Sequence, residues 1–293
     1  MRHRLLGLLI ACVALVSAGC DLNLLNPSGP APLRYRDDVF AATTRTNNIV
    51  FGSAVDQTGA TVTLRLDKYE PTGDTATARP AIVFVHGGGF SSGSRTSPEI
   101  VDEATLFARK GYVIVSIDYR LWSGGCFPPT TQCLTAITDA KHDAQAAVRY
   151  MRANAGTLKV DPNRIAIAGT SAGAITALNV GYGPEDVGTS GNPGFPSTVR
   201  AAVSLSGSAV LTTPNPGEAP ALFFHGDADP LVSYQAAVNT ADAARAAGLE
   251  VNFTTWPGEG HVPYVQHRQQ ILDQTRNFLY WTLDLAHAPQ NLP

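Results

Sequence analysis

The stretch that decides the fold of this chain reads Arg164-Ile165-Ala166-Ile167-Ala168-Gly169-Thr170-Ser171-Ala172-Gly173. Residues 165–168 form a continuous apolar run, the pattern of a strand covered on both faces. Gly169 to Gly173 then matches G-x-S-x-G, in which the glycines permit a sharp strand-to-helix turn that exposes the serine hydroxyl. An Ala-rich helix is expected over residues 172–180, and its N-terminal dipole favours a developing negative charge beside Ser171. The stretch therefore predicts a strand, a tight turn carrying a nucleophilic serine, and a helix.

The same pattern occurs a second time, at Gly89-Phe90-Ser91-Ser92-Gly93. Ser91 lies well past the preceding apolar run and continues into Ser94-Arg95-Thr96-Ser97-Pro98, which has the composition of a loop. Because the chemistry needs the strand, turn and helix in direct succession, Ser171 is the candidate nucleophile and Ser91 is a chance match.

Strand-like and helix-like segments alternate along the rest of the chain. We expect strands at 48–51, 62–69, 81–85, 112–117, 164–168, 199–205, 221–225 and 251–256, and helices at 99–110, 134–154, 172–180, 234–247 and 264–283. Such alternation predicts an α/β fold, a mostly parallel eight-stranded sheet with helices on both faces. Right-handed crossovers then place the strand-to-helix loops on one edge of the sheet, where ligands bind.

Composition narrows the classes of function. The chain has 293 residues, 24 acidic against 21 basic, a net charge of −3 and 44% apolar residues. This apolar fraction can fill a real core and excludes disorder as a global description. A nucleic-acid partner is not expected, because affinity for phosphate backbones needs a basic surplus.

The first nineteen residues have the pattern of an export signal. Two arginines lie within residues 1–4, residues 5–16 are almost wholly apolar, and Ser17-Ala18-Gly19 is a run of small residues. The apolar run is too short for a membrane-spanning helix, which needs about 20 residues. Ser17-Ala18-Gly19-Cys20 resembles the lipobox of bacterial lipoproteins, with Ser17 where that motif usually has Leu. We therefore expect an exported protein, either a cell-envelope lipoprotein anchored to the membrane by a lipid on Cys20 or a plainly secreted one.

Two further expectations concern the chain after the leader. Residues 20–40 include Asn26-Pro27-Ser28-Gly29-Pro30 and are expected to form a flexible tether, with the folded domain over residues 41–293. Cys126 and Cys133 are expected to pair, because an exported protein meets an oxidising compartment; two buried free thiols are the alternative. A metal site is not expected, because no second Cys or His pair lies nearby at zinc-like spacing.

A run of glycines could stabilise an oxyanion. His86-Gly87-Gly88-Gly89-Phe90 follows the expected strand at 81–85, and glycines there let backbone N–H groups converge on one point. We expect the N–H groups of Gly88, Gly89 and Ala172 to form the oxyanion hole. A phosphate loop is disfavoured, because neither a Walker lysine nor a G-x-G-x-x-G pattern opening into a helix is present.

An acid and a base are expected on later loops of the same edge. The strand at 221–225 is followed by two aspartates, of which Asp229 is preferred because Pro230 and the apolar pair after it fix the turn; Asp227 is assigned to the turn itself. His261 lies in a Gly-rich turn after the last strand. Of the histidines that follow Asp229, His261 is the one expected on this edge, because His267 and His287 fall in or beyond the last helix.

The motifs together resemble those of the α/β-hydrolases, specifically the carboxylesterase and hormone-sensitive-lipase-like group that carries His86 to Gly89 with Gly169 to Gly173. Leu66-Asp67-Lys68-Tyr69-Glu70-Pro71 looks like the lead-in of small bacterial esterases, including feruloyl-esterase-like members. The resemblance covers about residues 45–285. It implies Ser171 as nucleophile, His261 as base and Asp229 as its orienting acid, with no metal or organic cofactor. Many relatives carry a helical cap, but residues 35–45 and 206–220 are too short for one, so an open site is expected.

The expected activity is hydrolysis of a short-chain or polysaccharide-attached carboxylic ester through an acyl-enzyme. A peptidase or amidase of the same fold would use the same three residues and remains an alternative. A non-catalytic lipoprotein that keeps the fold is the other alternative; it would be expected to lack a member of the triad, and none is missing.

Overall fold

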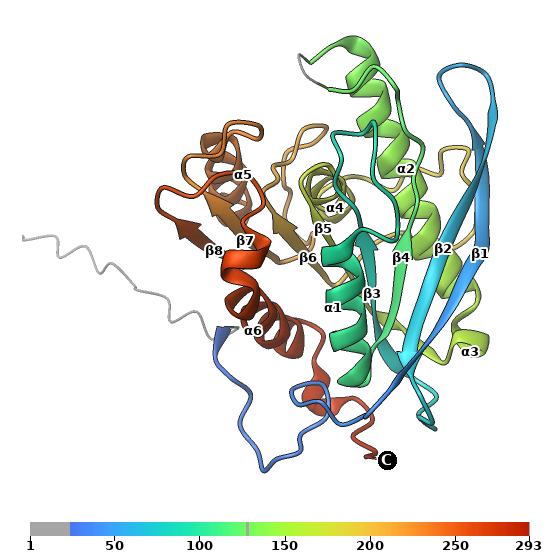
Figure 1. Cartoon of the computed structure of the whole chain (residues 1–293), viewed down its shortest axis with the longest axis vertical. Helices are drawn as coiled ribbons and strands as arrows, with labels where there is room; N and C mark the ends of the chain where they lie inside the picture. The colour runs from blue at the N-terminus through green and yellow to red at the C-terminus, as the bar shows by residue number, and fades with distance from the viewer. Residues whose placement is uncertain (1–23, 127–128, 293) are drawn as a thin grey trace, which may run out of the picture.

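The computed structural model describes residues 24–126 and 129–292 (Figure 1), so the expected signal at 1–19 and the lipidation site at Cys20 lie outside the described residues. One eight-stranded sheet has the order β1-β2-β4-β3-β5-β6-β7-β8. The strands are β1 (Thr43–Val55), β2 (Thr61–Pro71), β3 (Arg79–Val85), β4 (Val113–Ile117), β5 (Val160–Thr170), β6 (Ala201–Leu205), β7 (Ala221–Gly226) and β8 (Val251–Trp256). β1 and β2 pair antiparallel with each other, β2 pairs antiparallel with β4, and the other neighbours pair parallel, which confirms the predicted sheet.

Helices cover both faces of this sheet (Figure 1). They are α1 (Pro98–Arg109), α2 (Thr131–Ala153), α3 (Ala155–Leu158), α4 (Ala172–Gly181), α5 (Tyr234–Ala246) and α6 (Tyr264–Thr282), with a short 3-10 turn, η2 (Leu285–His287). Side chains of α1 and α6 pack in one core, and those of α2, α4 and α5 in another. β3 shows the division, because Val83 and Val85 belong to the second core and Ile82 and Phe84 to the first. A strand covered on both faces has no position for a polar side chain, which is why this run is continuously apolar.

The β1–β2 hairpin is longer than the residue pattern predicted. Its register runs from Thr43 opposite Pro71 to Val55 opposite Thr61, whereas strands were expected only at 48–51 and 62–69. Many of the additional β1 residues are polar and exposed, so the hydrophobic periodicity used to find strands is weak there. Pairing with β2 supplies the backbone hydrogen bonds that keep them extended.

The expected tether at residues 20–40 differs from the structure over its described part. The side chain of Arg34 is fully buried, and its guanidinium donates to Asp74 at 3.1 Å and to the carbonyl of Asn291 at 2.6 Å. Tyr35 is buried as well, and its hydroxyl donates to the carbonyl of Pro289 at 2.9 Å. From residue 33 onward this segment is therefore an integral part of the domain.

The connections on the carboxyl edge of the sheet determine access to the site. Within the described residues, no helix is inserted between β6 and β7, and β7 leads directly through a loop to α5. The segments expected to be too short for a helical cap, 35–45 and 206–220, contain no helix, so the fold places no cap at either of them, as expected. In the same part of the chain, no helix is long and apolar enough to cross a bilayer.

Candidate active site

Ser171 lies at the turn between β5 and α4 in a backbone conformation that is costly for any residue other than glycine. Its φ is 53° and its ψ is −118°, and such strain persists only where the surroundings over-determine it. A Cβ on Gly173 would lie 2.0 Å from the carbonyl oxygen of Val85, so the helix can approach β3 this closely only with glycine there. The Ser171 N–H donates to the carbonyl of Leu205 at 2.8 Å, which anchors the turn to β6.

Three loops bring their side chains together at this turn. Nε2 of His261, which lies between β8 and α6, is 2.7 Å from the Ser171 hydroxyl oxygen. Nδ1 of the same ring is 2.7 Å from Oδ2 of Asp229, on the loop after β7. The hydroxyl, the imidazole and the carboxylate thus form one hydrogen-bonded chain, an arrangement that can remove a proton from the hydroxyl.

Asp229 is held in its ionised form. Burial alone would raise the pKa of this carboxyl, but hydrogen bonds from His225 and His261 and from the amides of Leu231 and Val232 outweigh burial and leave the pKa well below its usual range. The two amides donate to Oδ1 at 2.8 and 3.0 Å. A permanent negative charge beside Nδ1 favours the tautomer that leaves Nε2 free to accept a proton.

His225 and Asp227 lie near the relay but are not members of it. Nε2 of His225 lies 3.2 Å from Oδ2 of Asp229 and 3.0 Å from the carbonyl oxygen of Val232, a role for this histidine that the residue pattern did not predict. Asp227 lies outside the relay and accepts from the Gly258 N–H at 2.7 Å, which links the loops after β7 and β8. This is the turn role assigned to it.

The glycine run after β3 supplies backbone donors. Gly88 and Gly89 have φ values of 114° and 60°, which favour glycine. Within residues 24–126 and 129–292, the N–H groups of Gly88, Gly89 and Ala172 make no hydrogen bond to a protein acceptor. The Tyr119 hydroxyl donates to the His86 carbonyl at 3.0 Å and its ring stacks on the His86 ring, which supports the loop from behind. Unused donors beside a nucleophile are the components of an oxyanion hole.

Ser91 takes no part in the relay. Its hydroxyl donates to the carbonyl of Gly88 at 3.3 Å, and its N–H donates to the same carbonyl. Both contacts shape the glycine loop.

Two pockets meet at Ser171. The first, which we call the apolar pocket, has a volume of about 200 Å³ and is lined by Phe90, Ile137, Ile175 and Val210 together with Cys126 and Cys133. These cysteines form a disulfide, so the alternative of two free thiols does not hold. The second, which we call the His261 pocket, has a volume of about 400 Å³ and is lined by Gly88, Gly89, Glu99, Thr170 and His261. A substrate bonded to Ser171 can therefore extend in two directions with different surroundings.

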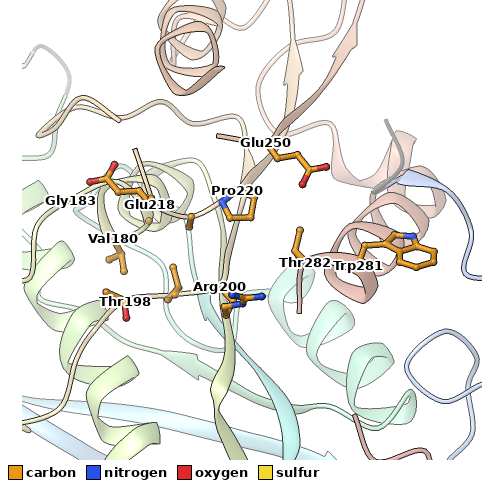
Figure 2. Close-up of a pocket in the computed structure, with 13 residues that line it drawn as sticks. Val180, Gly183, Thr198, Arg200, Glu218, Pro220, Glu250, Trp281 and Thr282 are labelled. Atoms are coloured by element: carbon orange, nitrogen blue, oxygen red, sulfur yellow. The ribbon is translucent and has the colours of Figure 1, made fainter. Parts of the chain in front are cut away.

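Another pocket, of about 420 Å³, lies at the opposite edge of the sheet (Figure 2). Its lining includes Arg200, Glu218, Glu250 and Trp281, and no member of the relay. No cluster of three or more histidine, cysteine, aspartate or glutamate side chains suited to a metal ion occurs in the described part of the chain.

Comparison with known proteins places the chain in a family. The model of the family described as BD-FAE matches residues 66–213, about half of the chain. The chain belongs to the BD-FAE family. A second model, the prolyl oligopeptidase family, matches residues 200–288. The BD-FAE match begins in β2 and covers the glycine run and Ser171, whereas the second match covers Asp229 and His261.

Relatives of this BD-FAE member include named esterases. Carboxylesterase NlhH of Mycobacterium tuberculosis is 34% identical over 109 residues, covering 37% of this chain and 31% of the relative. Chlorogenic acid esterase of Aspergillus niger is 33% identical over 109 residues, covering 36% of this chain and 21% of the relative. The aligned region thus spans less than a third of the length of these curated relatives.

A solved structure matches over most of the chain. The butyrate-bound form of esterase Est2 from the planctomycete Thermogutta terrifontis superposes with a TM-score of 0.69 at 24% identity, covering 88% of this chain and 99% of that one. With the strand order described above, this likeness shows that the chain has the α/β-hydrolase fold.

Proposed function

We propose that this chain is a serine esterase that hydrolyses carboxylic esters through an acyl-enzyme on Ser171. The observation that carries the proposal is the relay of Ser171, His261 and Asp229, with 2.7 Å at each link, beside the unused N–H groups of Gly88, Gly89 and Ala172. Relatives named as esterases support the same class of reaction.

The geometry assigns a task to each group. His261 Nε2 takes the hydroxyl proton as Ser171 attacks the ester carbonyl, and the negative charge develops on the carbonyl oxygen near the three N–H groups. Removal of one such donor typically costs about 3 kcal/mol of transition-state stabilisation. His261 then gives its proton to the departing alcohol, which leaves the acyl group bonded to Ser171. A water molecule that gives a proton to His261 next attacks this acyl-enzyme, and the acid is released as Ser171 regains its proton. Asp229, held ionised, stabilises the imidazolium that forms in each half-reaction.

The position of His261 orients the substrate. Because the departing alcohol receives its proton from Nε2, the alcohol half must lie in the His261 pocket, and the acyl half then occupies the apolar pocket. A pocket of about 200 Å³ walled by aliphatic and aromatic side chains and a disulfide suits a short or medium apolar acyl group. In the described residues no helix is inserted after β6 or β7, so the site stays open on this side. An alcohol attached to a polysaccharide can fit there.

A panel of esters tests the proposal. Wild type and Ser171→Ala are assayed on p-nitrophenyl esters of increasing acyl length and on an acetylated polysaccharide. We expect hydrolysis by wild type, a loss of about 10⁴-fold or more in kcat for Ser171→Ala, and a decline once the acyl chain exceeds the apolar pocket. Equal activity of the two proteins on every ester would refute the assignment.

A peptidase of the same fold is the second candidate, and the prolyl oligopeptidase match over residues 200–288 is the observation in its favour. The relay would act in the same way on an amide. Matched ester and anilide substrates with one acyl group separate the two candidates. Faster hydrolysis of the anilide would favour the peptidase.

Export is part of the proposal as well. Residues 1–19 would be removed and Cys20 would carry the lipid that anchors the protein to the cell envelope, which is the expectation from the leader pattern. Mass spectrometry of the mature N-terminus of wild type and Cys20→Ala tests this. A lipid mass on wild type that is lost in the variant supports anchoring, whereas an unmodified cleaved terminus in both supports plain secretion.

A further inference from the structure

Glu99 lies in the His261 pocket and has no task in the reaction described so far. It belongs to the first turn of α1, is partly buried, and lines the same pocket as Ser171 and His261. The hydroxyl of Thr170, the residue before the nucleophile, lies 3.4 Å from Oε1 of Glu99, a long hydrogen bond that joins the carboxylate to the residue next to Ser171.

Within the described residues, Glu99 forms no ion pair with a lysine, arginine or histidine. Its acidic neighbour Asp102 is already paired, since it accepts from Arg268 at 2.6 Å and from the Tyr264 hydroxyl at 2.7 Å. Burial, together with the charges of Glu99 and Asp102, raises the pKa of Glu103 to about 8, so Glu103 is mostly neutral at pH 7. The unpaired negative charge at this end of the pocket therefore belongs to Glu99.

The two halves of the substrate meet different electrostatic surroundings. The described lining of the His261 pocket has two ionisable side chains, Glu99 and His261. The described lining of the apolar pocket has none, since its two cysteines form a disulfide. A charge on the acyl half would lose hydration without a partner, whereas a charge on the alcohol half would interact directly with Glu99.

We propose that Glu99 is a specificity-determining residue, which favours esters whose alcohol half carries a positive charge and disfavours those whose alcohol half is anionic. The inference rests on the proposed esterase function, because it assigns the alcohol half to the His261 pocket. The alcohol half carries the same charge in the bound substrate and in the transition state. Glu99 therefore stabilises both states to a similar extent, and its removal should change KM more than kcat.

Three butyrate esters that share one acyl group measure the effect. Choline butyrate has a cationic alcohol, 3,3-dimethylbutyl butyrate is its uncharged counterpart, and 2-sulfoethyl butyrate has an anionic alcohol. We expect wild type to favour the choline ester over the sulfoethyl ester in kcat/KM, and Glu99→Gln to reduce that ratio by about tenfold, mostly through KM. Glu99→Asp keeps the charge and should retain most of the preference. Raising the ionic strength from about 0.01 M to about 1 M should also reduce the wild-type ratio.

Glu250→Gln is the matched control, because Glu250 is an exposed carboxylate in the pocket at the opposite edge of the sheet. It should leave the choline-to-sulfoethyl ratio unchanged. If wild type hydrolyses the uncharged ester but Glu99→Gln has the wild-type ratio, the inference is wrong and the esterase function stands. If wild type hydrolyses p-nitrophenyl butyrate but none of the three esters, the inference is wrong and the esterase function stands; if it hydrolyses none of these four and no ester of the earlier panel, both are wrong.

Discussion

Two aspartates lie two residues apart on the loop after β7, and their surroundings give them different tasks. Asp229 is buried against two histidines and accepts two backbone N–H groups, which hold it ionised and fixed in direction. Asp227 is exposed and accepts the Gly258 N–H. At the scale of single residues, hydrogen-bond partners therefore decide function where residue type does not.

The first prediction compares these two residues. Asp229→Asn replaces an acceptor-only side chain by one that can present N–H to Nδ1 of His261, which favours the wrong tautomer, so kcat should fall about 10³- to 10⁴-fold. Asp227→Asn keeps the turn and should change kcat less than about tenfold. Steady-state kinetics on p-nitrophenyl butyrate measure both. A large loss in Asp227→Asn with near-normal Asp229→Asn would reverse the assignment.

The second prediction concerns Glu103 on α1. Burial, with the charges of Glu99 and Asp102, raises the pKa of its carboxyl to about 8 in the folded protein, whereas the unfolded chain releases this proton near pH 4.3. Between these pH values the folded state binds more protons, so the stability from this group is complete below about pH 4.3 and is lost as the pH rises through about 8.

Glu103→Gln cannot ionise, so this loss should disappear. From about pH 5 to about pH 8 the unfolding free energy of wild type should fall by roughly 3 kcal/mol relative to the variant. Urea unfolding at several pH values measures the difference, with the exposed Glu250→Gln as control. Parallel pH curves for wild type and Glu103→Gln would show that the carboxyl is not held protonated.

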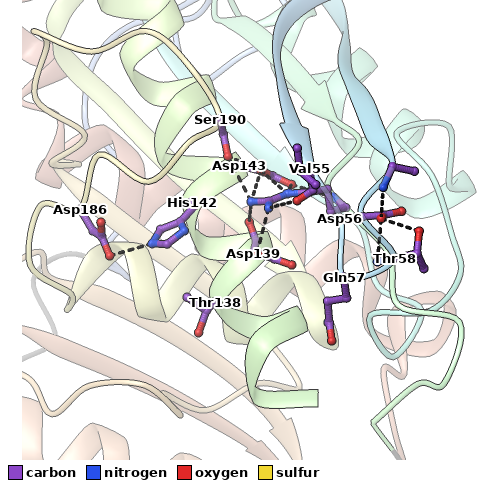
Figure 3. A network of polar contacts seen from close by, with 12 residues as sticks. Val55, Asp56, Gln57, Thr58, Thr138, Asp139, His142, Asp143, Asp186 and Ser190 are labelled. Atoms are coloured by element: carbon purple, nitrogen blue, oxygen red, sulfur yellow. Dashed lines mark hydrogen bonds and ion pairs between the residues drawn. The ribbon is translucent and has the colours of Figure 1, made fainter. Parts of the chain in front are cut away.

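At the scale of elements, a buried network of charged and polar side chains joins α2 to neighbouring segments (Figure 3). The side chain of Asp143 is fully buried and accepts from the Arg120 N–H at 2.7 Å, from its guanidinium at 2.8 to 3.0 Å and from the Ser190 hydroxyl at 2.5 Å. Arg120 also donates to the Val55 carbonyl at 3.0 Å. One ion pair thus joins α2 to the loop after β4, to β1 and to the segment before β6.

The third prediction removes one side of this pair. Asp143→Ala leaves the buried guanidinium of Arg120 with Asp139 as its remaining carboxylate, and should reduce the unfolding free energy by about 3 kcal/mol. Asp186→Ala is the control, because Asp186 also contacts α2, through His142 at 2.7 Å, but is about half exposed; its loss should cost less than about 1 kcal/mol. Similar denaturation midpoints for the two variants would contradict the structural role of Asp143.

At the scale of the whole molecule, the two ends of the described chain lie against each other. The Asn277 side chain and the Trp281 indole donate to the carbonyls of Leu24 and Leu25, both at 2.9 Å. Arg34 joins Asp74 to the carbonyl of Asn291. Residues from both ends therefore close the same side of the domain, next to α6 (Figure 1).

The fourth prediction tests this closure with two shortened chains. A chain that begins at Leu24 keeps these contacts, whereas one that begins at Ala41 leaves Asp74 buried with Arg79 at 3.8 Å as its remaining cation. The shorter chain should lose about 3 kcal/mol or more of unfolding free energy, and Arg34→Ala should reproduce most of that loss. Equal thermal midpoints for the two chains would restore the original expectation of a tether.

Much of the fold and of the candidate site could be predicted from local patterns. The apolar run at 165–168, the glycines at 169 and 173 and the helix after them specify a strand–turn–helix within ten residues, because backbone conformation depends on near neighbours. Once strands and helices alternate, handedness places the loops bearing Ser171, Asp229 and His261 on one edge. The parallel sheet was predicted in this way and is confirmed.

Contacts between residues distant in the sequence decided the rest. Proline and glycine at 27–30 are typical of a linker, yet Arg34 finds its partners 40 and 257 residues away. The place of Glu99 beside the nucleophile also depends on how α1 packs against the turn that carries Ser171, since Glu99 and Thr170 are 71 residues apart in the sequence. A buried charge is stable only where a partner compensates its lost hydration, and the partner is known only once the chain has folded.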